Sequence, residues 1–520
     1  MGASAVPNGT GVPDPHAAWE LALPDADATE RLARLVAEEL RPGDLVTLSG
    51  GLGSGKTTFA RAVIRALAQD PELEVPSPTF TLMQGYDTPA GNVLHADLYR
   101  IGGPLELTEI GFDEMAERSI ALVEWPERGT GALSPLRLDV ALDLDLAAGP
   151  DARRVVLTGT GDFAGRLQRM KGIRLLLEGA GWGDAKRVPL QGDASTRAYE
   201  RLVRPSGERA ILMISPRRPD GPPIRRGRPY SAIAKLAESV HAFAAVARGL
   251  AALDLSAPTI YAEDLEGGLL LLEDLGDEPV VDAGSPIPDR YGEGTALLAK
   301  LHGTELQKVL PVDGGEHALP PYDLEAYLIE VELLLDWYAP YVLGTQLSGS
   351  VRAEFVNVWS EILAEVLAAP QTWTLRDYHS PNLIWMAERD GIRRVGVLDF
   401  QDAVLGHPAY DVASLLQDAR VTVPADLELK LLGVYARERR AADPTYDVAA
   451  FARGYAILGA QRATKILGIF ARLDKRDGKP QYLKHLPRIE GYLARDLAHP
   501  VLARLKGWYE AHVPRLVEPV

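Results

Sequence analysis

A glycine-rich stretch runs Gly50-Gly51-Leu52-Gly53-Ser54-Gly55-Lys56-Thr57 and matches the phosphate-binding pattern G-x-x-x-x-G-K-[ST] at every fixed position. Glycines let successive backbone N–H groups turn toward one anion, because no Cβ stands in the way. Lys56 would place its charge on the β- and γ-phosphates of a nucleotide, and the Thr57 hydroxyl can hold Mg²⁺. The predicted nucleotide-binding residues are Gly50, Gly51, Gly53, Ser54, Gly55, Lys56, Thr57 and Thr58.

The sequence on either side of this stretch fits a strand–loop–helix unit. Residues 45–48 are a short apolar run that predicts a buried strand, and residues 57–67 predict a helix with one apolar face. That face consists of Phe59, Val63, Ile64 and Leu67. The helix N-terminus would then point at the phosphates. The alternative is a glycine-rich turn that binds nothing, and the order of strand, loop and helix argues against it.

Acidic and hydroxyl groups farther along the chain would complete this site. Residues 120–123 predict an apolar strand that ends at Glu124, where a carboxylate could serve as a Mg²⁺ ligand. Asp97 is a candidate for a second, catalytic carboxylate that orients water or metal; the alternative is a solvated acid at a strand end. The loop at residues 75–82 carries two prolines that exclude a helix. Its hydroxyls either sense the γ-phosphate or belong to an ordinary polar loop.

Length and composition limit the possible classes of protein. A chain of 520 residues is too long for one ordinary core, which predicts two or three domains. Its 72 acidic and 55 basic residues leave a net charge of −17, which argues against strong direct binding of nucleic acid. The absence of cysteine excludes disulfides and thiolate metal sites. Residues 1–17 predict a disordered tail, no apolar run is long enough for a membrane span, and the cytoplasm is the expected location.

The motifs of the first part occur together in one known family. Residues 18–167 resemble TsaE, the ATPase subunit of the bacterial machinery that makes threonylcarbamoyladenosine in tRNA. The motifs that carry the resemblance are Gly50–Thr57, Ser77–Phe80, His95–Arg100 and Val123–Pro126. The resemblance implies an α/β P-loop NTPase domain that hydrolyses ATP while docked on the other subunits of the complex. By position, Thr57 and Glu124 would hold Mg²⁺ and Lys56 the phosphates, and Asp97 would assist hydrolysis.

A change of pattern marks the end of the first domain. A last strand is expected at residues 153–157, followed by a loose glycine-containing segment and a short helix at about residues 163–170. The first domain is therefore expected at residues 18–167 and the second at residues 168–520, with the boundary near Lys171.

The second part begins with strand-like segments and is mainly helical beyond residue 290. Strands are expected at residues 209–214 and 269–273, after a polar turn at residues 192–197. A small β-rich lobe followed by a larger helical lobe suits an α+β, protein-kinase-like fold. Glu273 and Leu275 lie at the expected hinge between the lobes, where backbone groups would meet the adenine edge of ATP.

The strongest pattern in the second part is Leu375-Arg376-Asp377-Tyr378-His379-Ser380-Pro381-Asn382, followed by an apolar strand that ends at Asp399. An Asp, an Asn five residues later and a second Asp after a strand form the catalytic arrangement of kinases. Asp377 would accept the proton of the acceptor hydroxyl. Asn382 and Asp399 would hold metal ions between the phosphates. For His379 we expect a structural role, as a packed hydrogen-bond bridge.

One group that many kinases use is missing from this pattern. The strand at residues 209–214 carries Met213 and no lysine, whereas a lysine in that strand commonly pairs with the α- and β-phosphates. Arg197, Arg217 or Arg218 could supply the charge, and the sequence does not decide between them.

The second part also resembles a known family. Residues 172–508 are similar to the aminoglycoside phosphotransferase superfamily and, within it, to the cell-wall amino-sugar kinases called AmgK. The motifs that carry the resemblance are Gly192–Arg197, Leu270–Gly276, Leu375–Trp385, Leu398–Asp402, Tyr410–Asp411 and Lys465–Leu473. The resemblance implies phosphorylation, by ATP and Mg²⁺, of the anomeric hydroxyl of N-acetylmuramate or N-acetylglucosamine, as in peptidoglycan recycling.

Two alternatives to an amino-sugar kinase stay open. One is a kinase-like scaffold without transfer activity, since the strand lysine is missing. The other is a kinase of a different small hydroxyl substrate such as an aminoglycoside. An aminoglycoside is a polycation and needs an acidic pocket, whereas residues 461–465 are basic and favour an anionic acceptor.

Overall fold

The computed structural model describes residues 16–190, 197–217 and 221–518. The chain divides into two compact units, residues 1–175 and 176–520. The predicted tail at residues 1–17 lies outside the described residues except at its end, where a strand begins at His16. The last two residues of that tail therefore belong to the sheet of the first unit.

The described part of the first unit is built on a seven-stranded sheet. Its strands are β1 (His16–Leu23), β2 (Leu45–Ser49), β3 (Met83–Thr88), β4 (Gly91–Asp97), β5 (Ile120–Glu124), β6 (Leu138–Leu144) and β7 (Arg153–Thr160). They are ordered β1-β7-β6-β2-β5-β4-β3. Because β2 and β4 both pair in parallel with β5, the carboxyl ends of these strands meet at one edge of the sheet.

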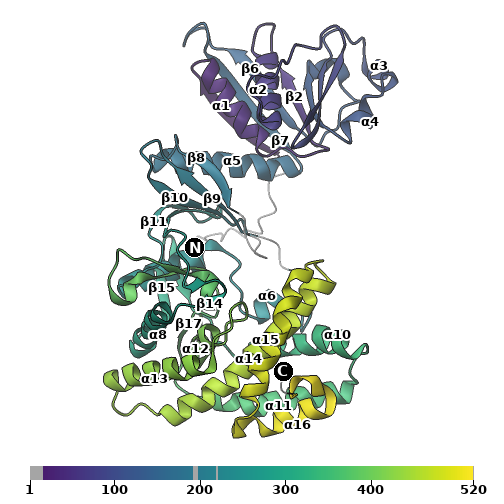
Figure 1. The fold of residues 1–520 in the computed structure, drawn as a ribbon. Coiled ribbons are helices and arrows are strands. Elements are labelled where there is room, and N and C mark those ends of the chain that lie inside the picture. The colour runs from purple at the N-terminus through teal and green to yellow at the C-terminus, as the bar shows by residue number, and fades with distance from the viewer. Residues whose placement is uncertain (1–15, 191–196, 218–220, 519–520) are drawn as a thin grey trace, which may run out of the picture. The chain divides into compact units, whose positions relative to one another are not determined.

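Helices cover both faces of this sheet. They are α1 (Ala26–Ala37), α2 (Lys56–Ala68), α3 (Pro104–Glu109), α4 (Phe112–Ala116) and α5 (Asp162–Gly179). Helices α1 and α2 pack side by side against one face (Figure 1), and α3 and α4 belong to a separate core cluster. Neighbouring residues of β2 alternate between the two cores, with Val46 in one and Leu45 in the other. The predicted helix after the phosphate loop is confirmed, and its apolar face is buried.

Helix α5 is longer than predicted. The expected short helix at residues 163–170 continues without a break to Gly179, and the division between the two compact units falls inside it, after Leu175. Buried side chains recur every three or four residues along it, at Phe163, Leu167, Met170, Ile173 and Leu177. This spacing keeps one face of the helix buried past Met170, where we expected the helix to end.

The second unit opens with a five-stranded antiparallel sheet in its described residues. The strands are β8 (Lys186–Leu190), β9 (Ala198–Val203), β10 (Arg209–Ile214), β11 (Ile260–Asp264) and β12 (Leu269–Glu273), ordered β11-β12-β10-β9-β8. Helix α7 (Val240–Ala252) lies between β10 and β11 in the chain. The predicted strands at 209–214 and 269–273 are confirmed, whereas the predicted turn at 192–197 lies outside the described residues except for Arg197.

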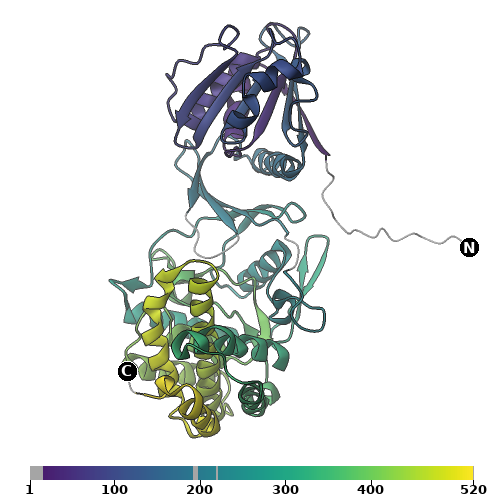
Figure 2. The ribbon, with the colours of Figure 1, turned by 90° about the vertical axis from the view of Figure 1, so that its right-hand side faces the viewer.

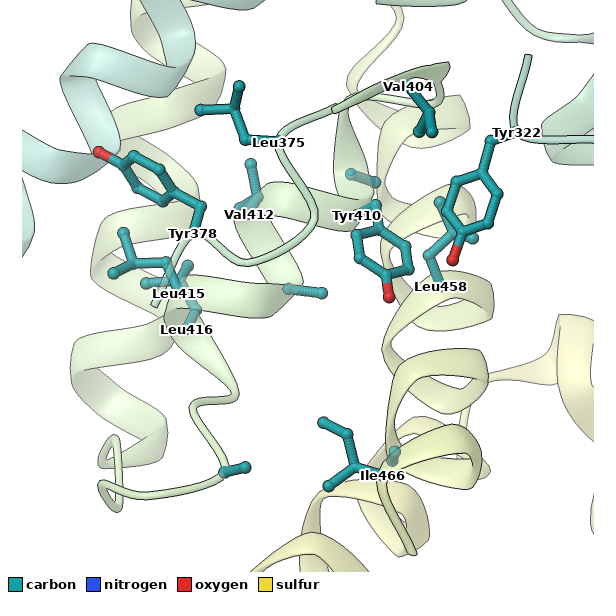
Figure 3. Close-up of a cluster of buried hydrophobic side chains, with 14 of the residues drawn as sticks. Tyr322, Leu375, Tyr378, Val404, Tyr410, Val412, Leu415, Leu416, Leu458 and Ile466 are labelled. Carbon is teal, nitrogen blue, oxygen red and sulfur yellow. The ribbon is translucent and has the colours of Figure 1, made fainter. Parts of the chain in front are cut away.

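The rest of the second unit is mainly helical. Its longer helices are α8 (Pro288–Gly303), α9 (Leu324–Leu333), α11 (Gly349–Ala368), α12 (Ala409–Leu416), α13 (Ala425–Ala442), α14 (Val448–Lys475), α15 (Leu486–Asp496) and α16 (Ala503–His512). Helix α14 packs against α9, α12 and α15, and the last of these runs beside it in both views (Figures 1 and 2). Figure 3 shows part of the core, where Val412 and Leu416 of α12 and Leu458 of α14 are buried.

Two short strand pairs carry the loops of the predicted kinase site. They are β17 (Thr372–Thr374) with β20 (Val404–Gly406), and β18 (Leu383–Trp385) with β19 (Val395–Val397). The predicted fold class is confirmed: an α/β unit precedes an α+β unit with a β-rich and a helical lobe.

Candidate active sites

The phosphate loop of the first unit connects β2 to α2 and depends on its glycines. Gly50, Gly53 and Gly55 all have positive φ, which side chains rarely tolerate. A Cβ on Gly50 would lie 2.1 Å from the carbonyl oxygen of Leu142. Helix α2 begins directly after the loop at Lys56, so its N-terminal N–H groups face the loop. Thr58 lies in the first turn of α2 and is half-buried.

The ammonium of Lys56 is held over the loop. Its Nζ donates to the carbonyls of Gly50 (2.7 Å) and Gly51 (2.8 Å) and lies 3.7 Å from the ring centroid of Trp125. Burial lowers the pKa of Lys56 below its ordinary value, although the charge of Glu124 opposes this. Trp125 lies against this ammonium and against Tyr99.

Two predicted carboxylates end neighbouring strands at the same level. Asp97 of β4 and Glu124 of β5 are direct partners in the strand register. The Thr57 hydroxyl donates to Glu124 Oε2 at 2.9 Å, which brings the two predicted Mg²⁺ ligands of the first unit together. Asp97 is buried and accepts hydrogen bonds from the hydroxyls of Ser77 (3.0 Å) and Thr79 (2.6 Å). The alternative of a solvated strand-end acid is therefore wrong for Asp97.

Two residues of this site were not singled out from the sequence. His95 Nε2 lies 2.9 Å from Glu124 Oε1 with both groups buried, so the ring fixes the orientation of that carboxylate. Arg153 of β7 donates through Nε to the carbonyl of Ser54 at 2.9 Å and so braces the phosphate loop. His95 lies within the mainly apolar strand β4, so its burial could have been inferred from the sequence. The residue that Arg153 contacts is 99 residues away, so no local pattern indicates this contact.

The second unit holds a cleft of about 820 Å³ between its β-rich and helical lobes. Its walls include the predicted residues Glu273, Leu275, Asp377, Asn382 and Asp399. The structure thus brings together, in one cleft, the kinase-site residues that are distant in sequence. A cavity of this size is typical of a small-molecule site.

Buried carboxylates hold the loop that carries Asp377. Asp411, in the first turn of α12, accepts the backbone N–H groups of Leu375 (2.7 Å) and Arg376 (2.8 Å). Asp418 accepts the backbone N–H of Ser380 at 2.9 Å. These bonds satisfy buried donors of the loop and set its backbone before any substrate binds.

Strand pairing places Asn382 beside Asp399. Asn382 directly precedes β18 and Asp399 lies two residues after β19, and these strands are antiparallel partners. Leu398 donates from its backbone N–H to the carbonyl of Asn382 at 2.9 Å. Asn382 Nδ2 donates to the carbonyl of Asp377 at 2.9 Å, which leaves its side-chain oxygen as an acceptor or metal ligand.

The two aspartates of the cleft have opposite pKa shifts. Burial by itself would raise the pKa of Asp377, but His379 when protonated and the charges of Lys465, Arg376 and Arg462 outweigh burial and hold this pKa below its ordinary value. Burial and the charge of Asp377 raise the pKa of Asp399, against the guanidinium of Arg197. Asp377 is therefore the carboxylate better suited to stay ionised.

His379 has the bridging geometry that we expected for a structural histidine. Arg420 Nη1 donates to its Nε2 at 2.7 Å, so the proton of the neutral ring is on Nδ1, which donates to the carbonyl of Asp377 at 2.9 Å. Burial lowers the pKa of His379, which favours this neutral form.

The hinge region is tied to the sheet by charged pairs. The Glu273 carboxylate accepts from Arg389 Nη2 at 2.7 Å, while Leu275 is buried. Arg201 of β9 pairs with Asp274 (2.9 Å) and Asp277 (2.5 Å) of the hinge. Arg201 was not singled out from the sequence, because its two partners come from another part of the chain.

Of the three arginines considered in place of the missing lysine, one lies at the cleft. Arg197 lines the cleft and donates from Nη1 to Asp399 Oδ1 at 3.2 Å. Arg217 is exposed and is not among the described cleft residues, and Arg218 lies outside the described residues.

The donor sets can be tested against the metal that nucleotide chemistry uses. Within the described residues, no group of three or more His, Cys, Asp or Glu side chains could hold a metal ion by itself. Mg²⁺ is usually bound by one or two side-chain oxygens together with phosphate and water oxygens. Thr57 with Glu124, and Asn382 with Asp399, offer such hard oxygen pairs.

No helix in the described part of the chain is long and apolar enough to cross a membrane.

Two family models match the chain. The model of TsaE, the threonylcarbamoyl adenosine biosynthesis protein, matches residues 23–155, and the model of the phosphotransferase enzyme family matches residues 186–452. The chain belongs to the phosphotransferase enzyme family and carries a TsaE domain ahead of that part.

Individual relatives agree with this assignment. The chain is 42% identical over 351 residues to the N-acetylmuramate/N-acetylglucosamine kinase of Caulobacter vibrioides, which covers 65% of this chain and 95% of that kinase. It is 33% identical to the kinase of the same name from Pseudomonas putida, covering 62% of this chain and 88% of that one. It is 39% identical to the tRNA threonylcarbamoyladenosine biosynthesis protein TsaE of Rickettsia felis, covering 24% of this chain and 72% of that protein. The predicted fusion of two families is confirmed.

Proposed function

We propose that the chain carries two enzymes. Residues 18–167 act as the ATPase of tRNA threonylcarbamoyladenosine biosynthesis, docked on other subunits of that machinery. Residues 168–520 transfer phosphate from ATP to N-acetylmuramate and N-acetylglucosamine, as the names of the relatives suggest. The observation that carries the kinase proposal is the convergence of Asp377, Asn382 and Asp399 on one cleft. Because both activities use cytoplasmic substrates, we place the protein in the cytoplasm.

In the proposed kinase step the acceptor hydroxyl lies against Asp377. The anomeric oxygen forms a bond to the γ-phosphorus of ATP, the bond from that phosphorus to the β,γ-bridging oxygen breaks, and ADP leaves. Asp377 accepts the proton of the hydroxyl, which suits a carboxylate whose pKa is held low by nearby positive charge. Asn382 and Asp399 are the residues that would hold Mg²⁺, which supplies charge neutralisation at the phosphates when bound.

The ATPase site of the first unit uses a different set of residues. We assign the phosphates to the Gly50–Thr57 loop and Lys56, and Mg²⁺ to Thr57 and Glu124, whose side chains already meet at 2.9 Å. Asp97 assists hydrolysis by keeping the Ser77–Thr79 segment in place beside the phosphates, since it accepts hydrogen bonds from both hydroxyls. His95 and Arg153 position Glu124 and the loop.

The alternatives are less well supported than a sugar kinase. A scaffold without activity has no need for buried carboxylates that orient the Asp377 loop, and Arg197 offers a cation where the strand lysine is missing. An aminoglycoside is a polycation, whereas Arg420, Arg462 and Lys465 line the cleft.

A direct acceptor screen tests the kinase proposal. Purified full-length protein is incubated with γ-labelled ATP and Mg²⁺ and with N-acetylmuramate, N-acetylglucosamine or an aminoglycoside, and sugar phosphate is measured. We expect transfer to the amino sugars, and loss of that transfer by about 100- to 10,000-fold in Asp377→Asn. Transfer to neither amino sugar by the unmodified protein would contradict the proposal.

A further inference from the structure

The wall of the kinase cleft contains a buried arginine with an unusual set of partners. Arg462 of α14 is 6% exposed and lines the same cleft as Asp377. Its Nη1 donates to the backbone carbonyl of Gln417 at 3.2 Å. Within the described part of the chain, no carboxylate forms an ion pair with Arg462. A guanidinium has five N–H donors, and the bond to Gln417 uses one of them.

Two cations near Arg462 differ from it. Lys465, one turn farther along α14, donates to the buried carboxylate of Glu330 at 2.8 Å. Arg376, on the catalytic loop, pairs with the same carboxylate. Each of these cations therefore contacts a carboxylate of the protein itself. Burial of a guanidinium without such a partner is costly, which suggests that an anion brought by the substrate completes the site of Arg462.

The position of Arg462 places that anion on the acceptor side of the cleft. The positive charge of Arg462 acts on both Asp377 and His379, so it lies near the catalytic loop. Farther along the same helix, Ile466 and Ile469 line the cleft as an apolar strip. Figure 3 shows Ile466 on α14 and, across from it, Tyr410 on α12, which also lines the cleft. The donors proposed for nucleotide and metal come instead from Arg197, Asn382 and Asp399.

We propose that Arg462 binds the carboxylate of N-acetylmuramate and thereby distinguishes this acceptor from N-acetylglucosamine. This inference rests on the proposed kinase function. The two sugars differ by a lactyl ether, which gives N-acetylmuramate one carboxylate and leaves the anomeric hydroxyl common to both. A guanidinium can hold a carboxylate by two parallel N–H···O bonds. With the neutral sugar, the same donors meet only water.

A competing role for Arg462 makes a different prediction. If Arg462 serves only to keep Asp377 ionised, its loss raises the pKa of Asp377 and slows the transfer to both sugars alike. If it binds the carboxylate, its loss raises KM for N-acetylmuramate and leaves N-acetylglucosamine nearly unaffected. The two acceptors therefore separate the roles within one protein preparation.

The experiment measures kcat and KM for both sugars in full-length Arg462→Gln. We expect kcat/KM for N-acetylmuramate to fall about 10- to 100-fold, the range for a lost hydrogen bond to a charged group. For N-acetylglucosamine we expect a change of less than about threefold, which also reports that the variant is folded. Arg462→Lys keeps the positive charge but not the two parallel N–H donors of the guanidinium. In this variant kcat/KM for N-acetylmuramate should fall less than in Arg462→Gln. Arg453→Gln is the matched control, because Arg453 lies on the same helix but pairs with Glu365 outside this cleft.

Each result has a definite meaning. Equal losses for the two sugars, or no loss for either, would overturn the role of Arg462 while the kinase proposal stands. If Arg462→Gln does not fold, Arg462→Lys serves as the test. An unchanged KM for N-acetylmuramate in Arg462→Lys, with an unchanged ratio of kcat/KM between the two sugars, would count against the proposal. If the unmodified protein phosphorylates neither sugar, it is the proposed kinase function that fails.

Discussion

Individual charged residues in the kinase cleft determine which carboxylates are ionised. Asp377 and Asp399 are both half-buried in the cleft, yet cations near Asp377 lower its pKa, while the pKa of Asp399 is raised. If Asp399 must be ionised to hold Mg²⁺, the fall of activity on the acid side reports Asp399 and not Asp377. Arg197, whose guanidinium donates to Asp399, is the residue that opposes this upward shift.

Arg197→Gln should therefore move the acid side of the pH profile. Without the cation, burial and the charge of Asp377 raise the pKa of Asp399 further, so ionisation is lost at a higher pH. We expect the midpoint of the acid limb of kcat/KM to rise by roughly half to one pH unit, as one nearby charge can do. Arg217→Gln, at an exposed position, is the control and should leave the limb in place. An unshifted limb in Arg197→Gln would show that Arg197 does not act on Asp399.

At the scale of elements, helix α12 holds the catalytic loop through Asp411 and through Ser414, whose hydroxyl donates to the carbonyl of Arg376 at 3.1 Å. Asp411 accepts two backbone N–H groups of the loop. In Asp411→Asn one of these acceptors becomes an NH₂ group that faces an N–H donor, and a buried unsatisfied pair costs about 1–3 kcal/mol. We expect the free energy of unfolding by urea to fall by about that amount and kcat to fall at least about tenfold. Asp426→Asn, at an exposed acid in the first turn of α13, should change neither.

Helix α15 ends in a buried carboxylate whose neutral form the fold favours. Burial raises the pKa of Asp496 well above its ordinary value, and Gln417 Nε2 donates to it at 2.9 Å. A raised pKa in the folded state means that this group stabilises the fold only while it is protonated, and that stability is lost as the pH rises through the folded pKa. Asp496→Asn should therefore raise Tm at pH 7–8, by an amount equivalent to about 1 kcal/mol or more, and have little effect near pH 4. An Asp477→Asn variant, at an exposed acid, serves as the control, and a gain in Tm independent of pH would contradict this account.

The sequence predicted those parts of the sites whose residues are close together in the chain. The phosphate loop with its strand and helix, and the Asp377, Asn382 and Asp399 arrangement, follow from local spacing. The family resemblance also paired Thr57 with Glu124, which lie 67 residues apart. Long-range contacts outside such motifs could not be predicted, because the partner of Arg153 is 99 residues away and that of Arg462 is 45 residues away. The end of α5 was also missed, since the change of pattern near Lys171 suggested a domain boundary, whereas burial along one face extended the helix to Gly179.

At the scale of the whole molecule, each compact unit contains every residue proposed for its own site. Lys56, Thr57 and Glu124 lie in residues 1–175, and Asp377 and its metal-ligand candidates lie in residues 176–520. We therefore propose that the two activities are chemically independent, although one chain joins them.

Paired substitutions test this independence. Asp377→Asn removes the acceptor of the sugar proton and should abolish sugar phosphorylation, while threonylcarbamoyladenosine formation on tRNA, reconstituted with the partner subunits, stays within about twofold of the unmodified level. Lys56→Ala removes the cation over the phosphate loop and should do the reverse, with tRNA modification reduced at least about 100-fold and sugar phosphorylation unchanged. Each variant is the control for the other, since both are the same full-length chain. If either substitution silenced both activities in a protein with an unchanged Tm, ATP turnover at one site would have to depend on the other, and the picture of two separate enzymes would be wrong.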